Sequence, residues 1–212
     1  MNNFYKKGYD VIRYAVPDEL TNFCYKYIRN KRKVVNHMFK SNYLSSNDMS
    51  WGNWENEELF MNTYCHYSDL VMETLLEKLL PKVIKNTELN LAPTYSYLRM
   101  YKNNDVLTRH RDRPACEISC SLNLGGDEWP LFLDPTGGEG NKGIEIDLEP
   151  GDMLIYKGCD FEHWREPFTG QECCQVFFHY NDIDGPFFKD NKYDSRPFLG
   201  LPGDFRKSRK QL

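Results

Sequence analysis

Three residues of the sequence have the side chains and the spacing of a metal site that leaves room for further ligands. His110 and Asp112 stand two positions apart, and in an extended chain such side chains leave the same face. A second histidine, His163, follows another predicted strand further along the chain. Two imidazoles and a carboxylate on one face of an ion leave about three positions open, which suits Fe(II) that must also bind a chelating co-substrate and O₂. We therefore predict that His110, Asp112 and His163 bind a metal ion.

Two other interpretations of these residues fit the sequence less well. Zinc sites with two histidines and a carboxylate usually use a helical His-x-x-x-His pair, which the sequence does not contain. The His110-x-Asp112 pair would otherwise be a surface turn bonded to its three neighbouring arginines, and His163 a histidine of the core. The strands that precede both motifs favour the metal site.

The elements that must position these residues change character near Asn90. Before it, a helix is predicted to begin at Pro17-Asp18-Glu19, and Met72 to Val83 carry an amphipathic stripe that Pro81 should kink or end. Residues 41–56 read as a loop. After Asn90, short runs separated by turn residues predict the strands Tyr95–Tyr101, Glu117–Leu124, Trp129–Leu133, Gly143–Leu148, Asp152–Tyr156 and Cys173–Tyr180.

Several short strands after two helices predict a mostly β fold with N-terminal helices, of the α+β class. We expect its core to be a jelly roll, that is, a double-stranded β-helix. The length of 212 residues favours a single domain, 1–212. Within it, residues 1–90 would form a helical support, residues 91–185 the jelly-roll core and residues 186–212 a C-terminal extension.

Composition excludes several classes of protein. Aromatic residues make up 15% of the chain, which supplies a core and excludes disorder. A net charge of −4 argues against general nucleic-acid binding, and no run approaches the ~18 apolar residues of a membrane span. The polar N-terminus has no signal-peptide stretch, and the seven cysteines form no Cys-x-x-Cys pair. We expect an intracellular, soluble protein of the cytoplasm with reduced thiols, and the sequence does not indicate its oligomeric state.

The pattern His110-x-Asp112 … His163 on a strand-rich half resembles that of the Fe(II)/2-oxoglutarate-dependent dioxygenases, and among them the prolyl 4-hydroxylase-like group. The resemblance covers roughly residues 95–180. Four further segments agree with it: Tyr101, nine residues before His110, Ser121-Leu122-Asn123, Gly151-Asp152, and Pro167-x-Thr169-Gly170 after the distal histidine. No single one of these motifs is specific, but their combination is.

The resemblance implies an enzyme that hydroxylates a C–H bond, with 2-oxoglutarate and O₂ as co-substrates of Fe(II) and ascorbate as a further reductant. Its substrate would be a prolyl or other residue of a peptide or protein, or else a small molecule. Tyr101 would lie in the co-substrate pocket. Neither a nucleic acid nor a membrane is expected as a partner.

One position departs from the family pattern. These enzymes usually place an Arg or Lys after the distal histidine to pair with the far carboxylate of 2-oxoglutarate, where this chain has Cys173 and Cys174. A dianion in a partly dry pocket still requires a cation, preferably a guanidinium. Arg165, two residues after His163, is the first candidate, and Arg99, on the same strand face as Tyr101, is the second.

Two alternative functions therefore stay open at this point. The missing cation favours a cupin-like metalloenzyme that does not use 2-oxoglutarate, such as an isomerase or a thiol dioxygenase. A jelly-roll binding module without catalytic activity is the other alternative. The module would keep its function after His110→Ala, and no iron would co-purify with it.

Overall fold

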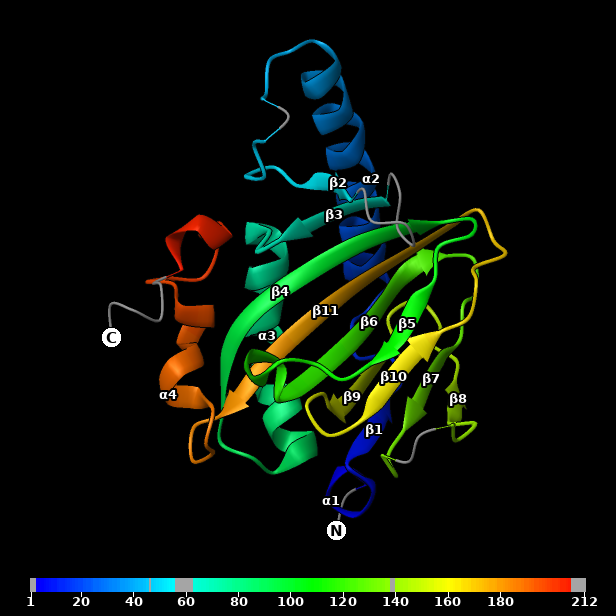
Figure 1. Cartoon of the computed structure of the whole chain (residues 1–212), viewed down its shortest axis with the longest axis vertical. Helices are drawn as coiled ribbons and strands as arrows, with labels where there is room; N and C mark the ends of the chain where they lie inside the picture. Colours follow the sequence, from blue (N-terminus) through cyan, green and yellow to red (C-terminus); the bar gives the residue numbers. More distant parts are fainter. Residues whose placement is uncertain (1–2, 46, 56–62, 138–139, 207–212) are drawn as a thin grey trace.

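The computed structural model describes residues 3–45, 47–55, 63–137 and 140–206, and its framework is a pair of antiparallel sheets (Figure 1). The larger sheet has the strand order β1 (Tyr9–Ile12), β9 (Met153–Lys157), β6 (Ile118–Gly126), β11 (Glu172–Asp182), β4 (Leu91–Lys102), β3 (Thr63–Tyr67) and β2 (Asn53–Glu55). The smaller sheet has the order β5 (Leu107–His110), β10 (Glu162–Arg165), β7 (Leu131–Asp134) and β8 (Ile144–Ile146). Each of the six predicted strands has a counterpart, and the predicted jelly roll is confirmed.

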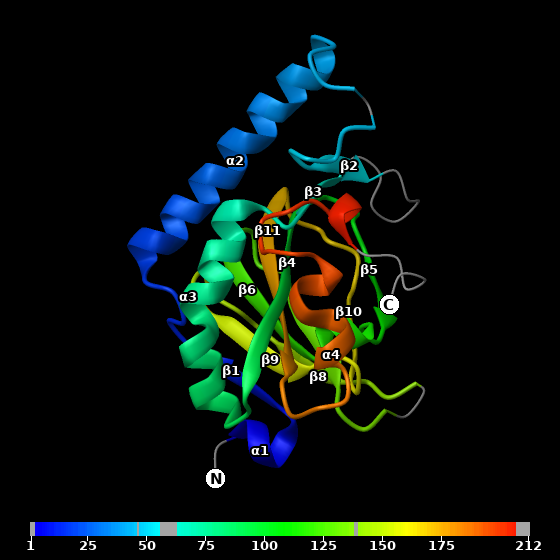
Figure 2. The ribbon, with the colours of Figure 1, turned by 90° about the vertical axis from the view of Figure 1, so that its left-hand side faces the viewer.

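Two long helices, α2 (Asp18–Lys40) and α3 (Leu70–Thr87), cover the face of the larger sheet that is turned away from the smaller sheet (Figure 2). The α3 stripe is buried at Met72, Leu76 and Val83, each side chain contributing roughly 1.5–3 kcal/mol of apolar burial. Asp69 begins this helix, since its carboxylate accepts a hydrogen bond of 3.0 Å from the Met72 N–H. The main core therefore lies between these helices and the sheet.

Pro81 lies inside α3 and does not end it, so one of the two predicted outcomes, an end of the helix, is wrong. The helix continues to Thr87, six residues further. Pro81 lies on the exposed face, as does Glu77, whose carbonyl would have accepted the missing N–H. Water can satisfy that carbonyl, and the buried stripe on the opposite face holds the helix in place.

Three strands lie within residues 1–90, which the sequence predicted to be a helical support. β1 extends one end of the larger sheet by pairing with β9, and β3 and β2 extend the other end beyond β4. β2 also falls inside the predicted loop 41–56. These strands are short and their apolar residues do not alternate clearly, so their extended conformation depends on the strands beside them.

The predicted C-terminal extension folds back as short helical segments: α4 (Phe188–Asn191) and 3₁₀ turns at Lys192–Ser195 and Gly203–Phe205. Residues 207–212 of that extension lie outside the described residues. The remaining elements are helix α1 (Asn3–Lys7) and a 3₁₀ turn at Pro114–Cys116. No helix in the described ranges combines the length and apolar character needed to cross a membrane.

Candidate metal centre and adjoining pocket

The pairing of β5 with β10 brings the two predicted histidine ligands face to face. His110 is the register partner of His163, and their ring centroids are 4.3 Å apart. Asp112 follows β5 directly, and its Oδ1 lies 3.7 Å from Nε2 of each histidine. The three ligand atoms lie within 4.8 Å of one another, so one ion can contact all of them. The structure thus brings together the three residues that the sequence singled out.

Backbone carbonyls orient both imidazoles. His110 Nδ1 lies 2.7 Å from the Thr108 carbonyl oxygen and His163 Nδ1 lies 3.4 Å from that of Phe161. A ring that donates from Nδ1 presents an unprotonated Nε2, which is the atom on the side of Asp112. Burial also lowers the pKa of His163 to about 4, so this side chain is the neutral imidazole that a metal requires. The donor set therefore fits Fe(II) or a similar divalent ion.

Asp112 is held by two contacts that the sequence did not reveal. Its backbone N–H donates to the Gly158 carbonyl at 2.9 Å, and its Oδ2 accepts a hydrogen bond of 2.6 Å from Ser119 Oγ. Because the Ser119 hydroxyl donates to this carboxylate, it accepts from His179 Nδ1, 3.0 Å away. Oδ1 is left for the metal.

We predict that Ser119→Ala weakens metal binding about tenfold to a hundredfold, the usual cost of losing a partner that orients a ligand. Anaerobic titration with Fe(II) measures the effect. Ser121→Ala is the matched control, since Ser121 is also buried on β6 but bonds Gln175 instead of Asp112. Equal affinities of the two variants would contradict this role of Ser119.

Gly158 provides the space that Asp112 occupies. A Cβ at this position would clash with the Cys116 carbonyl oxygen, and it would lie 2.5 Å from Ser119 Oγ and 2.6 Å from Asp112 Oδ2. We predict that Gly158→Ala lowers the free energy of unfolding by about 1–3 kcal/mol and weakens metal binding, because the ligand must move. Thermal unfolding and Fe(II) titration measure both effects. Gly203→Ala is the control, because a Cβ there meets only the flexible Arg206 side chain, and an equal loss in that variant would contradict the prediction.

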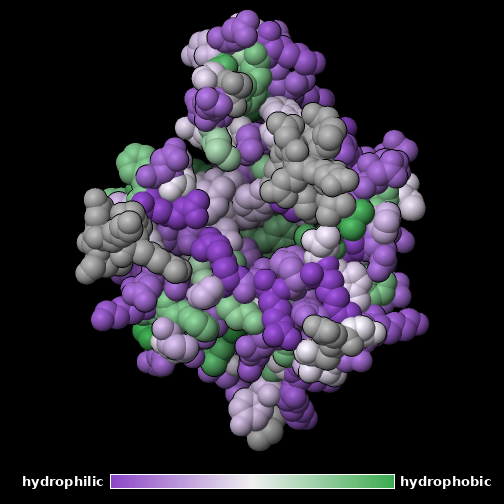
Figure 3. Space-filling view, viewed as in Figure 1, coloured by the Kyte–Doolittle hydropathy of each residue, from purple (hydrophilic) through white to green (hydrophobic). Residues whose placement is uncertain are grey.

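A cavity of about 150 Å³ adjoins the three ligands. Besides the ligands, the cavity is lined by Tyr95, Tyr97, Arg99, Tyr101, Leu107, Tyr156, Phe177 and His179. On the face seen in Figure 1, the surface is hollowed near its centre and much of the rim is hydrophilic (Figure 3). The lining combines aromatic walls with one guanidinium, as expected of a pocket for a small organic anion.

Of the three residues predicted to hold 2-oxoglutarate, Arg99 and Tyr101 line this cavity, whereas Arg165 is buried near Tyr101 and is not among the lining residues. Tyr101 is buried, and Arg99 Nη1 lies 3.5 Å from its hydroxyl. Burial raises the pKa of Tyr101, and the guanidinium groups of Arg99 and Arg165 both oppose this shift, so both cations lie near the ring. Tyr101 therefore lies near both candidate cations, Arg99 and Arg165.

Arg165 is only 1% exposed, and burial lowers its pKa. One of its Nη atoms donates to the Trp129 carbonyl, and its guanidinium lies 5.0 Å from the Trp129 ring centroid. Within the part of the chain that the structure describes, its Nε has no hydrogen-bond partner. Burial raises the pKa of the neighbouring Cys173 thiol, and the charge of Arg165 offsets only part of this increase. A buried cation with an unused donor therefore lies beside Cys173, one of the two cysteines at the position where a cation was expected.

His179 was not among the residues that the sequence predicted for the site. The structure places His179 in the wall of the cavity, bonded to Ser119. With Asp112 and Cys116 it forms a second group of side chains whose ligand atoms lie within 4.8 Å of one another. Cys116 bonds the Tyr95 hydroxyl at 3.0 Å. His37 and His66, in contrast, do not line this cavity.

No family model and no curated protein matches the sequence, but solved structures match the fold. A prolyl-4-hydroxylase from Pseudomonas putida has 16% identity and a TM-score of 0.56, over 85% of this chain and 95% of its own. The non-heme alpha ketoglutarate dependent epimerase SnoN of nogalamycin biosynthesis has 10% identity and a TM-score of 0.63, over 85% and 80%. HygX from Streptomyces hygroscopicus, solved with nickel and 2-oxoglutarate, has 13% identity and a TM-score of 0.56, over 97% and 92%. The chain shares the fold of 2-oxoglutarate-Fe(II) oxygenases, as the resemblance predicted.

Proposed function

We propose that this chain is an Fe(II)- and 2-oxoglutarate-dependent oxygenase that hydroxylates an unactivated C–H bond. One observation carries the proposal: Nε2 of His110, Oδ1 of Asp112 and Nε2 of His163 converge beside a cavity that also holds Arg99 and Tyr101. Three ligands on one side of an ion leave positions open for a chelating co-substrate and O₂. The solved structures of the same fold support this combination of metal and co-substrate.

The bound Fe(II) would supply the oxidation chemistry, in which 2-oxoglutarate, O₂ and R–H give succinate, CO₂ and R–OH. The residues of the chain bind and orient the reactants. Arg165, with its unused Nε donor, would pair with the far carboxylate of 2-oxoglutarate, and Tyr101 would bond it through its hydroxyl. Ser119 would keep the Asp112 carboxylate oriented toward the ion, and the aromatic side chains that line the cavity would limit the access of water.

The proposed substrate is a prolyl or other residue of a peptide or protein. Its support is the likeness in fold to a prolyl-4-hydroxylase and the tyrosine-rich wall of the cavity, formed by Tyr95, Tyr97 and Tyr156. Aromatic faces provide a dry surface for a small aliphatic ring. A fold of this kind also accommodates other chemistry, so the substrate has to be tested directly.

The experiment is an anaerobic titration of the metal-free protein with Fe(II), followed by addition of 2-oxoglutarate and O₂ and measurement of succinate. We expect one Fe(II) per chain and succinate formation that increases when a proline-containing peptide library is present. Protein that binds Fe(II) but never consumes 2-oxoglutarate would overturn the oxygenase proposal and favour the cupin-like alternative. Succinate formation that no peptide increases would overturn only the peptide substrate.

A further inference from the structure

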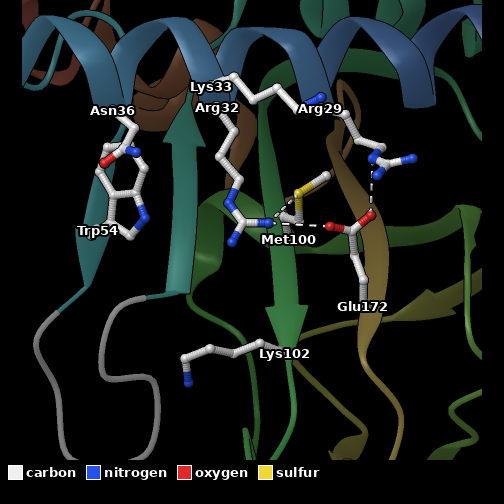
Figure 4. Close-up of a pocket in the computed structure, with 8 residues that line it drawn as sticks. All are labelled: Arg29, Arg32, Lys33, Asn36, Trp54, Met100, Lys102 and Glu172. Carbon is white, nitrogen blue, oxygen red and sulfur yellow. Dashed lines mark hydrogen bonds and ion pairs between the residues drawn. The ribbon is translucent and has the colours of Figure 1, made fainter.

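A second cavity, of about 630 Å³, lies between α2 and the outer face of the larger sheet. It is lined by Arg29, Arg32, Lys33, Asn36, Trp54, Met100, Lys102 and Glu172 (Figure 4). The four lining residues from α2 have the spacing i, i+3, i+4 and i+7, so they share one side of the helix. In Figure 4 Arg32 extends from the helix toward Met100 and Arg29 toward Glu172, whereas Lys33 runs along the helix.

This cavity is separate from the candidate metal centre. Side chains alternate between the two faces of a strand, and on β4 Met100 and Lys102 line the outer cavity while Arg99 and Tyr101 line the inner one. On β11 Glu172 likewise lies outside, whereas Phe177 lines the inner cavity. The larger sheet therefore stands between the two cavities.

The outer cavity is strongly positive, although the whole chain has a net charge of −4. Four cations and one carboxylate line it, and Asp105 pairs with one of the cations, Lys102, so the local charge is +2 when Asp105 is included. Glu172 binds two of the cations, with Oε1 3.3 Å from Arg29 Nε and Oε2 3.1 Å from Arg32 Nη1. Each contact uses one nitrogen of a guanidinium that has five N–H groups, so both arginines keep donors for an anion. Glu172 thus fixes the two guanidinium groups without occupying all of their hydrogens.

The other cations add to this site. Lys102 Nζ contacts Asp105 at 2.7 Å and keeps two further hydrogens, since an ammonium has three. Lys33 is exposed on α2. In Figure 4 Lys102 lies across the cavity from the helix, so the cations approach a ligand from two sides.

The opposite end of the cavity is aromatic and polar. Trp54 lies beside Asn36 there, away from Arg29 and Glu172 (Figure 4). The indole is fixed by Tyr64, at a centroid distance of 4.9 Å, and by Phe39, at 6.0 Å. A rigid aromatic ring and an amide that both donates and accepts are suited to a planar heterocyclic base.

We propose that the outer cavity binds a nucleoside phosphate, with its phosphates on the arginines and lysines and its base against Trp54 and Asn36. A volume of 630 Å³ exceeds what a single inorganic anion fills and falls in the usual range for organic ligands. A nucleic-acid strand would require an extended basic stripe, and α2 does carry Lys26, Lys31 and Lys40 besides the lining cations. The four lining cations and Trp54 nevertheless meet in one concave site, which favours a small ligand. The site is independent of the proposed oxygenase activity.

The test is calorimetric titration of the metal-free protein at low salt with ATP and, separately, with inorganic tripolyphosphate. We expect ATP to bind one-to-one, and Arg32→Ala and Lys33→Gln each to weaken it, Arg32→Ala by about tenfold to a hundredfold. Glu172→Gln should strengthen binding, because a competing negative charge is removed. Lys78→Gln, on the exposed side of α3, is the control and should leave the affinity unchanged.

Trp54→Leu tests the contact with the base. The substitution should weaken the binding of ATP by roughly tenfold and leave the affinity for tripolyphosphate unchanged. Retained tripolyphosphate binding shows that the variant is folded. No ATP binding, or an equal loss in Arg32→Ala and Lys78→Gln, would overturn the proposal. Tighter binding of a single-stranded oligonucleotide than of ATP would overturn it in favour of a nucleic-acid surface. His163→Ala should bind ATP normally, which separates this site from the metal centre.

Discussion

The His163→Ala protein is expected to bind Fe(II) more than about a hundredfold more weakly than the parent, beyond what loss of an orienting partner costs. Succinate formation should become undetectable. His163 is 4% exposed and supplies one of the three ligand atoms of the proposed set, so its removal leaves that set with two. Fe(II) titration measures the metal affinity, and succinate formation at saturating 2-oxoglutarate measures the activity.

His37→Ala is the matched control, since His37 is exposed on α2 and lies outside the metal centre. It should retain the affinity and the activity of the parent. Because His163→Ala leaves a small cavity in the core, its fold is checked by circular dichroism and by the melting temperature. A folded His163→Ala protein with unchanged Fe(II) affinity would contradict the proposed ligand set.

The Arg165→Met protein is expected to bind 2-oxoglutarate at least about thirtyfold more weakly, because truncating one partner of a buried charge pair costs about 2–5 kcal/mol. Its stability without co-substrate should stay equal or rise. In the absence of an anion, Arg165 is a buried cation, and a hydrophobic side chain of similar volume removes the cost of desolvating it. A residue that binds 2-oxoglutarate should lose affinity for it without losing stability when it is replaced. A purely structural residue should lose stability.

Arg99→Met is the comparison variant for this prediction. Arg99 lines the cavity, but its guanidinium lies 5.3 Å and 5.5 Å from the ring centroids of Tyr97 and Tyr101. Because these rings already stabilise part of its charge, we expect a smaller loss of 2-oxoglutarate affinity than for Arg165→Met. Displacement of 2-oxoglutarate by N-oxalylglycine, followed spectroscopically in the Fe(II) complex, measures both. A larger loss in Arg99→Met would assign the far carboxylate to Arg99 instead.

The sequence predicts the longer strands well and the shorter strands poorly. β4 and β11 are long and largely buried, so their apolar residues are visible in the sequence. β5 and β10 have four residues each, with the sequences LTRH and EHWR. Nothing in such segments favours extended structure by itself, and their conformation comes from pairing with each other and with β7.

Some residues of the candidate site could likewise be predicted from the sequence, and others could not. The three proposed ligands are visible because His110 and Asp112 lie two positions apart and because both this pair and His163 follow predicted strands. Ser119 and Gly158 are not visible, because one acts through a single hydroxyl and the other through the absence of a Cβ. Their roles depend on how closely three loops and strands approach Asp112, which no local pattern records.

The unequal burial of the two histidines has a consequence for the rate at which an ion is exchanged. His163 lies on β10, between two neighbouring strands, and its side chain is 5% exposed, whereas that of His110 is 39% exposed on β5 at the edge of the sheet. An edge strand of four residues opens far more often than the strand beside it. Dissociation should therefore begin with detachment of the His110 imidazole, so that the lifetime of the bound ion reports the opening of β5 and not the stability of the whole molecule.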